Sequence, residues 1–246
     1  MLLELQETPD VFGRILKAQL DSTEPIYHGL ERDDGYIDCP TAQKYFTTVE
    51  EWPAHEREIL QHAESPILDI GCGAGRHALY LQEQGMDVTG FDISEGAISV
   101  CRQRGLKKTV HGSATNLPSF QQSFNTFLLL FNNFGICGTP TDTVKMLNRI
   151  HQLGSRQAKI LLSFADPSGT KKPYHLALHQ RNRAEGLPIG QIRLRWRYLA
   201  YASSWFPLWL PTFQEFFDTI EKAQWTISKD LNNDGYHHVV LIKQER

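Results

Sequence analysis

The chain has 246 residues and is poor in cysteine, in net charge and in long apolar runs. Its cysteines lie far apart, without the paired spacing of a zinc site or a disulfide framework, so we expect reduced thiols. The four are Cys39, Cys72, Cys101 and Cys137. The apolar run at residues 127–131 is far too short to span a bilayer. A net charge of −3 and a pI near 6.4 argue against a general nucleic-acid surface.

The first residues of the chain, Met-Leu-Leu-Glu-Leu-Gln-Glu, carry acids where a signal peptide carries basic residues. We therefore expect a cytoplasmic protein that does not associate with membranes. With 41% hydrophobic residues, the chain can bury a core of its own. Its length predicts one large domain, or a domain with a sizeable addition.

Short apolar runs alternate with helical stretches between residues 66 and 164, which predicts a parallel α/β sheet. Three leucines in succession, Leu128 to Leu130, indicate a strand buried on both faces. The expected strands are 66–70, 87–92, 108–112, 124–131 and 157–164, and the expected helices are 75–85, 94–104 and 140–152. Such a doubly wound sheet forms a three-layer α/β/α sandwich that binds ligands outside the carboxyl ends of its strands.

The end of the chain predicts a helix and an antiparallel hairpin in place of another parallel crossover. Thr212 and Glu215 have the spacing of a capping box, which opens a helix that reaches about residue 223. Two strands follow at 225–231 and 236–243, joined by an Asn-Asn-Asp-Gly turn. The sheet is therefore expected to be mostly parallel and closed by an antiparallel C-terminal hairpin.

Two regions lie outside this pattern. The N-terminal segment, residues 1–65, predicts helices near 9–20 and 53–63 and a hairpin across 26–38. The remaining residues, 66–246, are expected to form the main domain, in which residues 166–211 are an insertion rich in basic and aromatic residues.

The most informative motif is Ile-Leu-Asp-Ile-Gly-Cys-Gly-Ala-Gly-Arg at residues 67–76. An apolar strand ends in Asp69 and runs into three alternating glycines, whose backbone N–H groups can approach a ligand closely. A second predicted strand ends in Asp92, seventeen positions after Gly75. An acid at about this distance beside a strand–turn–helix unit suits the hydroxyls of a ribose. The pattern predicts an adenosine-containing cofactor.

This motif resembles the glycine-rich loop of class I S-adenosylmethionine-dependent methyltransferases, and the antiparallel tail is similar to theirs. The resemblance implies S-adenosyl-L-methionine as cofactor, with its methionine part at the glycine loop, its ribose at Asp92 and its adenine near Ile93. It also implies that the reactive methyl group lies near the end of the fourth strand and that residues 1–65 form a lid. The implied cofactor contacts are Asp69, Gly71, Cys72, Gly73, Gly75, Asp92, Ile93, Ser113, Ala114, Phe131 and Asn132.

Ser113 departs from the family pattern, which usually has an aspartate there, and a serine can still accept a hydrogen bond. A second reading of the loop is open, since Gly73-Ala-Gly75-Arg-His-Ala78 satisfies the dinucleotide fingerprint of an NAD-dependent oxidoreductase. That register leaves Asp69 and Gly71 without a role. The chain also lacks the Asn/Asp-Pro-Pro-aromatic signature of enzymes that methylate amino groups of DNA bases, so DNA is not an expected partner.

The methyl acceptor is expected to contact the insertion. Arginines alternate with apolar residues at 191–198, which puts three of them on one strand face. This face is either an anion-binding wall or a solvated outer face. The candidate acceptor contacts are Asn133, Arg193, Arg195, Arg197 and Trp205. The hypothesis is methyl transfer to an oxygen, nitrogen or carbon of a small aromatic or anionic molecule, with RNA as the alternative acceptor.

His175 and His179 lie one helical turn apart and are the candidate general bases. As metal ligands they need a third partner, and none is evident, so no metal is expected. The oligomeric state is left open by the sequence.

Overall fold

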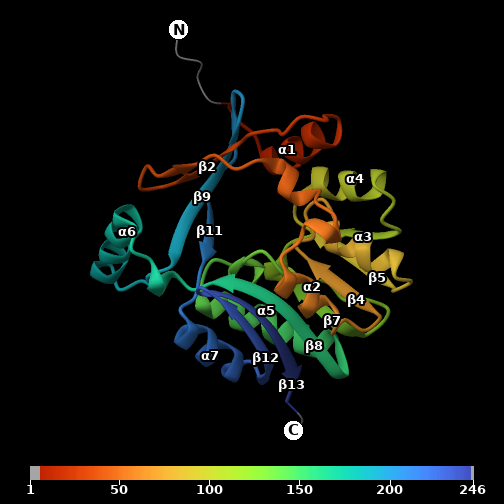
Figure 1. The fold of residues 1–246 in the computed structure, drawn as a ribbon. Helices are drawn as coiled ribbons and strands as arrows, with labels where there is room; N and C mark the ends of the chain where they lie inside the picture. The colour runs from red at the N-terminus through yellow and green to blue at the C-terminus, as the bar shows by residue number, and fades with distance from the viewer. Residues whose placement is uncertain (1–5, 245–246) are drawn as a thin grey trace.

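The structure is a computed structural model that describes residues 6–244 (Figure 1). Residues 1–5 and 245–246 lie outside the described part. Most of the N-terminal stretch that was compared with a signal peptide therefore lies outside it as well. Within residues 6–244 the strands form two sheets, one of seven strands and one of six. Of the helices in this part of the chain, none has the length and apolarity needed to cross a bilayer.

The seven-stranded sheet has the order β12-β13-β8-β7-β4-β5-β6. Its strands are β4 (Ile67–Ile70), β5 (Val88–Asp92), β6 (Lys108–His111), β7 (Phe124–Leu129), β8 (Gly154–Ala165), β12 (Trp225–Asn233) and β13 (Tyr236–Lys243). The five strands from β4 to β8 pair in parallel, whereas β13 is antiparallel to both β8 and β12. The predicted sheet, including its antiparallel hairpin, is confirmed.

Helices cover both faces of this sheet, as predicted. The helices α2 (Ala54–Leu60), α3 (Arg76–Glu83) and α4 (Glu95–Gln103) bury apolar side chains on one face, and α5 (Pro140–Leu153) and α7 (Phe213–Lys222) on the other. On β7, Phe127 and Leu129 belong to the second of these cores and Leu128 to the first. The leucine run is therefore buried on both faces, and the three-layer sandwich is confirmed.

The fourth parallel strand ends two residues earlier than expected. β7 stops at Leu129, and Phe131 and Asn132 have positive φ angles of 56° and 67°. Left-handed backbone is incompatible with a strand, so the chain turns sharply here. The turn brings Asn132 back to β8, where its Oδ1 accepts a hydrogen bond from the Ala165 amide at 2.8 Å.

The six-stranded sheet combines the N-terminal segment with the insertion. It consists of β1 (Gln6–Glu7), β2 (Gly29–Arg32), β3 (Ile37–Asp38), β9 (Gln191–Tyr198), β10 (Tyr201–Ala202) and β11 (Phe206–Trp209), with α1 (Val11–Leu20) and α6 (Pro173–Ala184) beside it. The insertion strand β9 pairs with β2 along one edge and with β10 and β11 along the other. Two segments that the sequence pattern treats separately thus build one layer, which lies over the carboxyl edge of the main sheet (Figure 1).

Short 3-10 helices complete the connections, at Ala42–Tyr45, Val49–Glu51, Ala114–Asn116, Asn133–Gly135 and Pro167–Gly169. The helix α1 crosses α4 at two glycines, where a Cβ on Gly13 would lie 2.6 Å from the Gly96 Cα. Asp10 reinforces this crossing, because its carboxylate accepts hydrogen bonds from the Gly13 and Gly96 amides and from the Ser94 hydroxyl. The N-terminal helix is therefore fixed to the main domain beside β5.

Candidate functional site

The glycine loop follows β4 and requires glycine at the three alternating positions. Gly71, Gly73 and Gly75 have φ angles of 75°, 56° and 78°, which L side chains rarely adopt. A Cβ on Gly71 would lie 2.4 Å from Asn133 Nδ2, and one on Gly75 would lie 2.9 Å from Cys101 Sγ. Asn133 donates from that nitrogen to the Ile70 and Gly71 carbonyls. Asn133, predicted as an acceptor contact, is placed here as a support of the loop.

The two acids of the motif lie at the carboxyl ends of adjacent strands. Asp69 is buried, and its Oδ2 makes no hydrogen bond within the described residues. Burial, and then the neighbouring charge of Asp92, raise the pKa of Asp69 to about 7. A buried carboxyl oxygen without a partner is costly. The ammonium group of an amino-acid ligand would satisfy it.

Asp92 connects β5 to the loop and to α4. Its Oδ2 accepts from the Gly73 amide at 2.9 Å, and its Oδ1 accepts from the Ser94 amide at 2.8 Å. Burial raises the pKa of this carboxyl, and the two amide hydrogen bonds act in the opposite direction. Carboxylate oxygens have further lone pairs, so Asp92 can also accept from ribose hydroxyls.

The other predicted cofactor contacts lie along the same edge of the sheet. Ile93 is 65% exposed beside Asp92 and offers an apolar surface. Ser113 Oγ accepts from the Thr115 amide at 3.3 Å and lies just before Ala114, which begins a 3-10 helix. Cys72 is buried, with its Sγ 3.8 Å from that of Cys101, so it packs behind the loop.

Aromatic side chains of the N-terminal segment cover the loop. A Cβ on Gly73 would meet the rings of Phe12 and Tyr45 at 3.8 and 3.9 Å. The Tyr45 ring also lies 6.3 Å from that of Phe131, and Phe12 stacks on Trp196 of β9 at 4.9 Å. Whether the N-terminal segment acts as a lid stays a prediction. Phe12 and Asp10 were not predicted, because nothing in the nearby sequence marks Phe12 as a contact of the loop or Asp10 as a contact of α4.

A second contact holds the N-terminal segment against α3. Glu56 forms an ion pair with Arg76, and the same carboxyl oxygen lies 2.6 Å from His77 Nε2, within hydrogen-bond distance. The Arg76 guanidinium lies over the rings of Trp52 and Phe131, 4.9 and 4.4 Å from their centroids. Burial, and then the positive charge of Arg76, hold the pKa of His77 well below its usual range.

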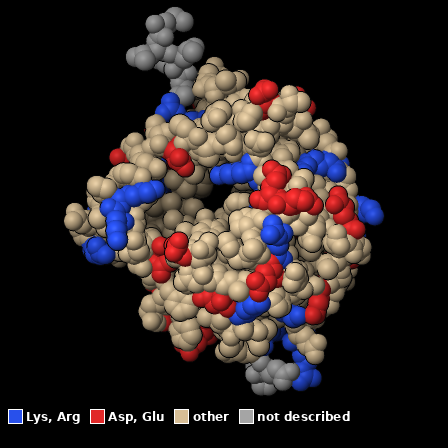
Figure 2. Space-filling view, in the orientation of Figure 1, with Lys and Arg blue, Asp and Glu red and all other residues tan. Residues whose placement is uncertain are grey.

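A cavity of about 1010 Å³ lies between the two sheets. Figure 2 shows this face hollowed between the part that carries α6 and the part that carries α2 and α3. Apolar side chains from both strands of the β9–β11 pair line the cavity, and Asn132 and Ala165 line it from the main sheet. Its charged lining residues are Arg32, Asp38, Asp166, Lys172, Asp230 and Asp234. Aspartates therefore outnumber basic residues, which disfavours a phosphate-rich polymer.

The three arginines of β9 do not line this cavity. Ile192 and Leu194 line it, and alternation along the strand puts the arginines on the other face. There Arg195 pairs with Glu31 at 2.7 Å, Arg197 pairs with the same carboxylate at 3.4 Å, and Arg193 is exposed. The Arg195 guanidinium lies over the Trp205 ring, with its Cζ atom 4.6 Å from the ring centroid.

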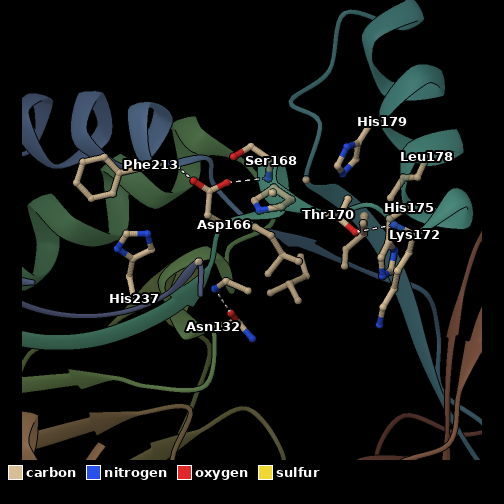
Figure 3. Close-up of a pocket in the computed structure, with 18 of the residues that line it drawn as sticks. Asn132, Asp166, Ser168, Thr170, Lys172, His175, Leu178, His179, Phe213 and His237 are labelled. Carbon is tan, nitrogen blue, oxygen red and sulfur yellow. Dashed lines mark hydrogen bonds between the residues drawn. The ribbon is translucent and has the colours of Figure 1, made fainter. Parts of the chain in front are cut away.

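His175 and His179 both line the cavity from α6, but their surroundings differ (Figure 3). The Nδ1 of His175 lies 3.0 Å from Arg32 Nη1, and because an arginine can only donate, this nitrogen is the acceptor. His179 is 4% exposed and makes no hydrogen bond within residues 6–244. Burial is the main cause that lowers the pKa of both imidazoles, and the positive charge of Arg32 also lowers both.

A third histidine, His237, lines the same cavity and was given no role by the sequence analysis. Its Nδ1 lies 2.9 Å from Asp230 Oδ2. Alternation along β13 separates the faces of His237 and His238, but the pairing with Asp230 depends on the hairpin register. The alternation along the strand could indicate which face of the sheet His237 lies on. Only the register of β12 against β13 shows that Asp230 is its partner.

Comparison with known proteins agrees with the motif. Residues 67–155 match a family model described as a methyltransferase domain. The probable S-adenosyl-L-methionine-dependent methyltransferase TehB of Haemophilus influenzae (strain 10810) is 26% identical over 151 residues, 53% of this chain and 53% of that protein. The chain thus spans about half the length of the first curated relatives that it matches.

Two solved structures resemble most or nearly all of the chain in fold. The crystal structure of a SAM-dependent methyltransferase from Bacteroides fragilis, in complex with S-adenosyl-L-homocysteine, aligns with a TM-score of 0.77 at 22% identity, over 98% of this chain and 99% of that one. The CcbJ methyltransferase from Streptomyces caelestis aligns with a TM-score of 0.59 at 14% identity, over 82% and 98%. At these identities the likeness shows the fold.

Proposed function

We propose, from the premise that this chain contains a class I S-adenosylmethionine-dependent methyltransferase domain, that it methylates a small molecule held between its two sheets. The observation that carries the proposal is the cavity of about 1010 Å³, which reaches the carboxyl end of the main sheet at Asn132. Its volume is at the upper end of small-molecule sites, about 300–1,000 Å³.

The cofactor is S-adenosyl-L-methionine, and the described residues fit it. When bound, it supplies a methyl group on a sulfonium, which is already activated toward nucleophiles. Asp69 would pair with its ammonium group through the unpartnered Oδ2, and the glycine-loop amides would hold its carboxylate. Asp92 would accept from the ribose hydroxyls, and Phe12 and Tyr45 would exclude water from above the loop.

The acceptor site favours an apolar or aromatic molecule over an anionic one. Leucine and isoleucine side chains of β9 and β11 line it, while Arg195 and Arg197 already pair with Glu31 on the far face. Of the predicted general bases, His179 is free to contact the acceptor, whereas the Nδ1 lone pair of His175 is engaged by Arg32. The role of these histidines stays a prediction.

The proposal is tested in two stages. Isothermal titration should detect S-adenosylhomocysteine and should not detect NAD; NAD binding alone would contradict the proposal. Incubation of the full chain with S-adenosylmethionine and a panel of small phenols, alcohols, amines and carboxylic acids should then release S-adenosylhomocysteine, measured by mass spectrometry. Methylation of total RNA, with no turnover of the panel, would favour the alternative acceptor.

A further inference from the structure

A histidine–aspartate pair lines the cavity from the hairpin of β12 and β13. His237 is 4% exposed, and its Nδ1 lies 3.1 and 2.9 Å from the two carboxyl oxygens of Asp230. A carboxylate only accepts, so the neutral imidazole carries its proton on Nδ1 and donates it to Asp230. The Nε2 atom therefore keeps its lone pair and is the basic nitrogen of the ring.

The ring is held in a fixed plane. It stacks on Phe164 with centroids 4.9 Å apart and planes 8° apart, and Phe213 lies 5.0 Å away. Asn232 Nδ2 lies 3.4 Å from Nε2. This amide nitrogen can only donate, which agrees with a lone pair on Nε2. At 3.4 Å the contact is long, so a hydroxyl group from a bound molecule can displace it.

The strand register places the pair at the edge where methyl transfer is proposed. His237 is opposite Phe164, and Tyr236 is opposite Ala165, the last residue of β8. Ala165 in turn donates to Asn132, which follows β7. His237, Ala165 and Asn132 all line the same cavity, and Figure 3 shows His237 and Asn132 there. The pair is thus presented at the carboxyl end of the parallel strands.

Three histidines line this cavity, and only one has its basic nitrogen set by a carboxylate. The Nδ1 lone pair of His175 accepts from Arg32, so the nitrogen available to a ligand is a donor. His179 has no partner within the described residues that fixes which nitrogen is protonated. His237 alone combines a cavity position with an orienting acid, which is the arrangement of a general base.

We propose that His237 is the general base of the reaction and that the methyl acceptor is a hydroxyl group on a molecule with an apolar body. This inference rests on the proposed function. The hydroxyl O–H bond breaks and its proton passes to Nε2 of His237. The oxygen forms the new bond to the methyl carbon as the sulfur–carbon bond breaks, and that electron pair remains on sulfur. The imidazolium that results is paired with Asp230, which stabilises it.

A general base favours a hydroxyl group over a carboxylate or an amine as the methyl acceptor. An alcohol or phenol becomes a strong nucleophile only as it loses its proton, so a base accelerates its methylation. A carboxylate is already ionised at neutral pH, and a neutral amine attacks before it loses a proton. The leucine and isoleucine wall formed by Ile192, Leu194, Leu208 and Leu210 suits an apolar body beside the hydroxyl.

The first test compares His237→Gln with His238→Gln, whose side chain lies on the same strand but faces the other side of the sheet. With the best phenol or alcohol of the panel, His237→Gln should lower kcat about a hundredfold or more and remove the acidic limb of the pH–rate profile. His238→Gln should stay within about twofold. Asp230→Asn should lower kcat less than His237→Gln does. Unchanged kcat in His237→Gln, or loss of the acidic limb in His179→Gln instead, would overturn the proposal.

The second test does not depend on turnover. In the full chain, ¹⁵N chemical shifts should show His237 with a protonated Nδ1 and a free Nε2, and Asp230→Asn should mix the two tautomers. Addition of p-cresol with S-adenosylhomocysteine should shift the Nε2 resonance. An Nε2-protonated ring would overturn the proposal. If S-adenosylhomocysteine does not bind, the proposed function fails; if it binds and only amines or acids are methylated, this inference alone fails.

Discussion

The two sheets of this molecule are built in opposite ways. The main sheet takes its parallel strands from one continuous stretch, β4 to β8, and the glycine loop proposed to hold the cofactor is defined by its backbone geometry. The second sheet joins β2 to β9, which come from the N-terminal segment and the insertion, and its cavity is lined by side chains from both. A cofactor site that depends on backbone can be read from local spacing, whereas an acceptor site assembled from distant segments cannot.

The glycine loop of the main sheet and the cavity wall of the second sheet differ in the side chains that they can accept. Gly71, Gly73 and Gly75 leave almost no freedom of residue type, because all three have φ angles that disfavour a side chain, and close neighbours also exclude one at Gly71 and Gly75. The cavity wall formed by Ile192 and Leu194 should tolerate any apolar side chain of similar size. Substitutions in the two parts should therefore have effects of different kinds and sizes.

The largest effect is expected from Gly71→Ala. A side chain at this φ costs about 1–2 kcal/mol, and the Cβ would lie 2.4 Å from Asn133 Nδ2. We expect a loss of at least about 2 kcal/mol in the free energy of unfolding, measured in urea, and no detectable S-adenosylhomocysteine binding by calorimetry. Gly85→Ala is the matched control, since Gly85 has a φ of 82° and nothing within 4 Å of a Cβ. Equal losses in both variants would refute the steric argument.

The next effect concerns the ribose contact. Loss of a charged hydrogen bond costs about 1.5–3 kcal/mol, so Asp92→Ala should weaken S-adenosylhomocysteine binding by about tenfold to a hundredfold. Asp87→Ala, which removes a surface partner of Lys108 before the same strand, should leave the affinity unchanged. Calorimetry measures both. An unaltered affinity in Asp92→Ala would show that the ribose assignment is wrong.

A pH effect should distinguish Asp69 from surface acids. Because burial raises its pKa from 3.8 to about 7, the folded state keeps a proton that the unfolded state releases. The free energy of unfolding should therefore fall as pH rises from about 4 to 7 and level off above. Asp69→Asn removes this contribution, so the variant should gain more than about 1 kcal/mol relative to the parent between pH 5 and pH 8. Urea unfolding at the two pH values checks it; a constant difference would contradict the raised pKa.

The smallest effect is expected within the second sheet. Glu31 joins β2 to β9 through Arg195 and Arg197, in a half-buried cluster. Glu31→Gln should cost less than about 1 kcal/mol in unfolding free energy and leave S-adenosylhomocysteine affinity unchanged. Lys145→Gln, which removes an exposed pair with Asp142 on α5, is the control. A tenfold loss of affinity in Glu31→Gln would mean that the two sheets are energetically coupled.

The sequence was most informative where structure is local. The strands, the helices and the antiparallel tail follow from periodicity, capping residues and turn residues, and the structure confirms them. It was less informative at strand ends, because the left-handed conformations of Phe131 and Asn132 depend on their hydrogen bonds to β8. Asn133 illustrates the limit: its type suggests a ligand contact, and its contacts are with the glycine loop.

The arginines of β9 and His237 of β13 show a second limit of the sequence. Alternation correctly put Arg193, Arg195 and Arg197 on one face of a strand, but alternation cannot say which face meets the cavity. That choice depends on what packs against β9, and the partner strand comes from the N-terminal segment. His237 had no sequence signal of function, because Asp230 is its partner only through the register of the hairpin.

By itself, the sequence determined the glycine loop that we propose holds the cofactor. Alternating glycines between a strand and a helix, with acids at both strand ends, specify the turn through backbone sterics that act over a few residues. Tertiary structure alone decided the proposed acceptor part: the pairing of β2 with β9, the exclusion of the arginines from the cavity and the contact of His237 with Asp230. These are contacts between distant segments, and side-chain packing selects them, so no local pattern encodes them.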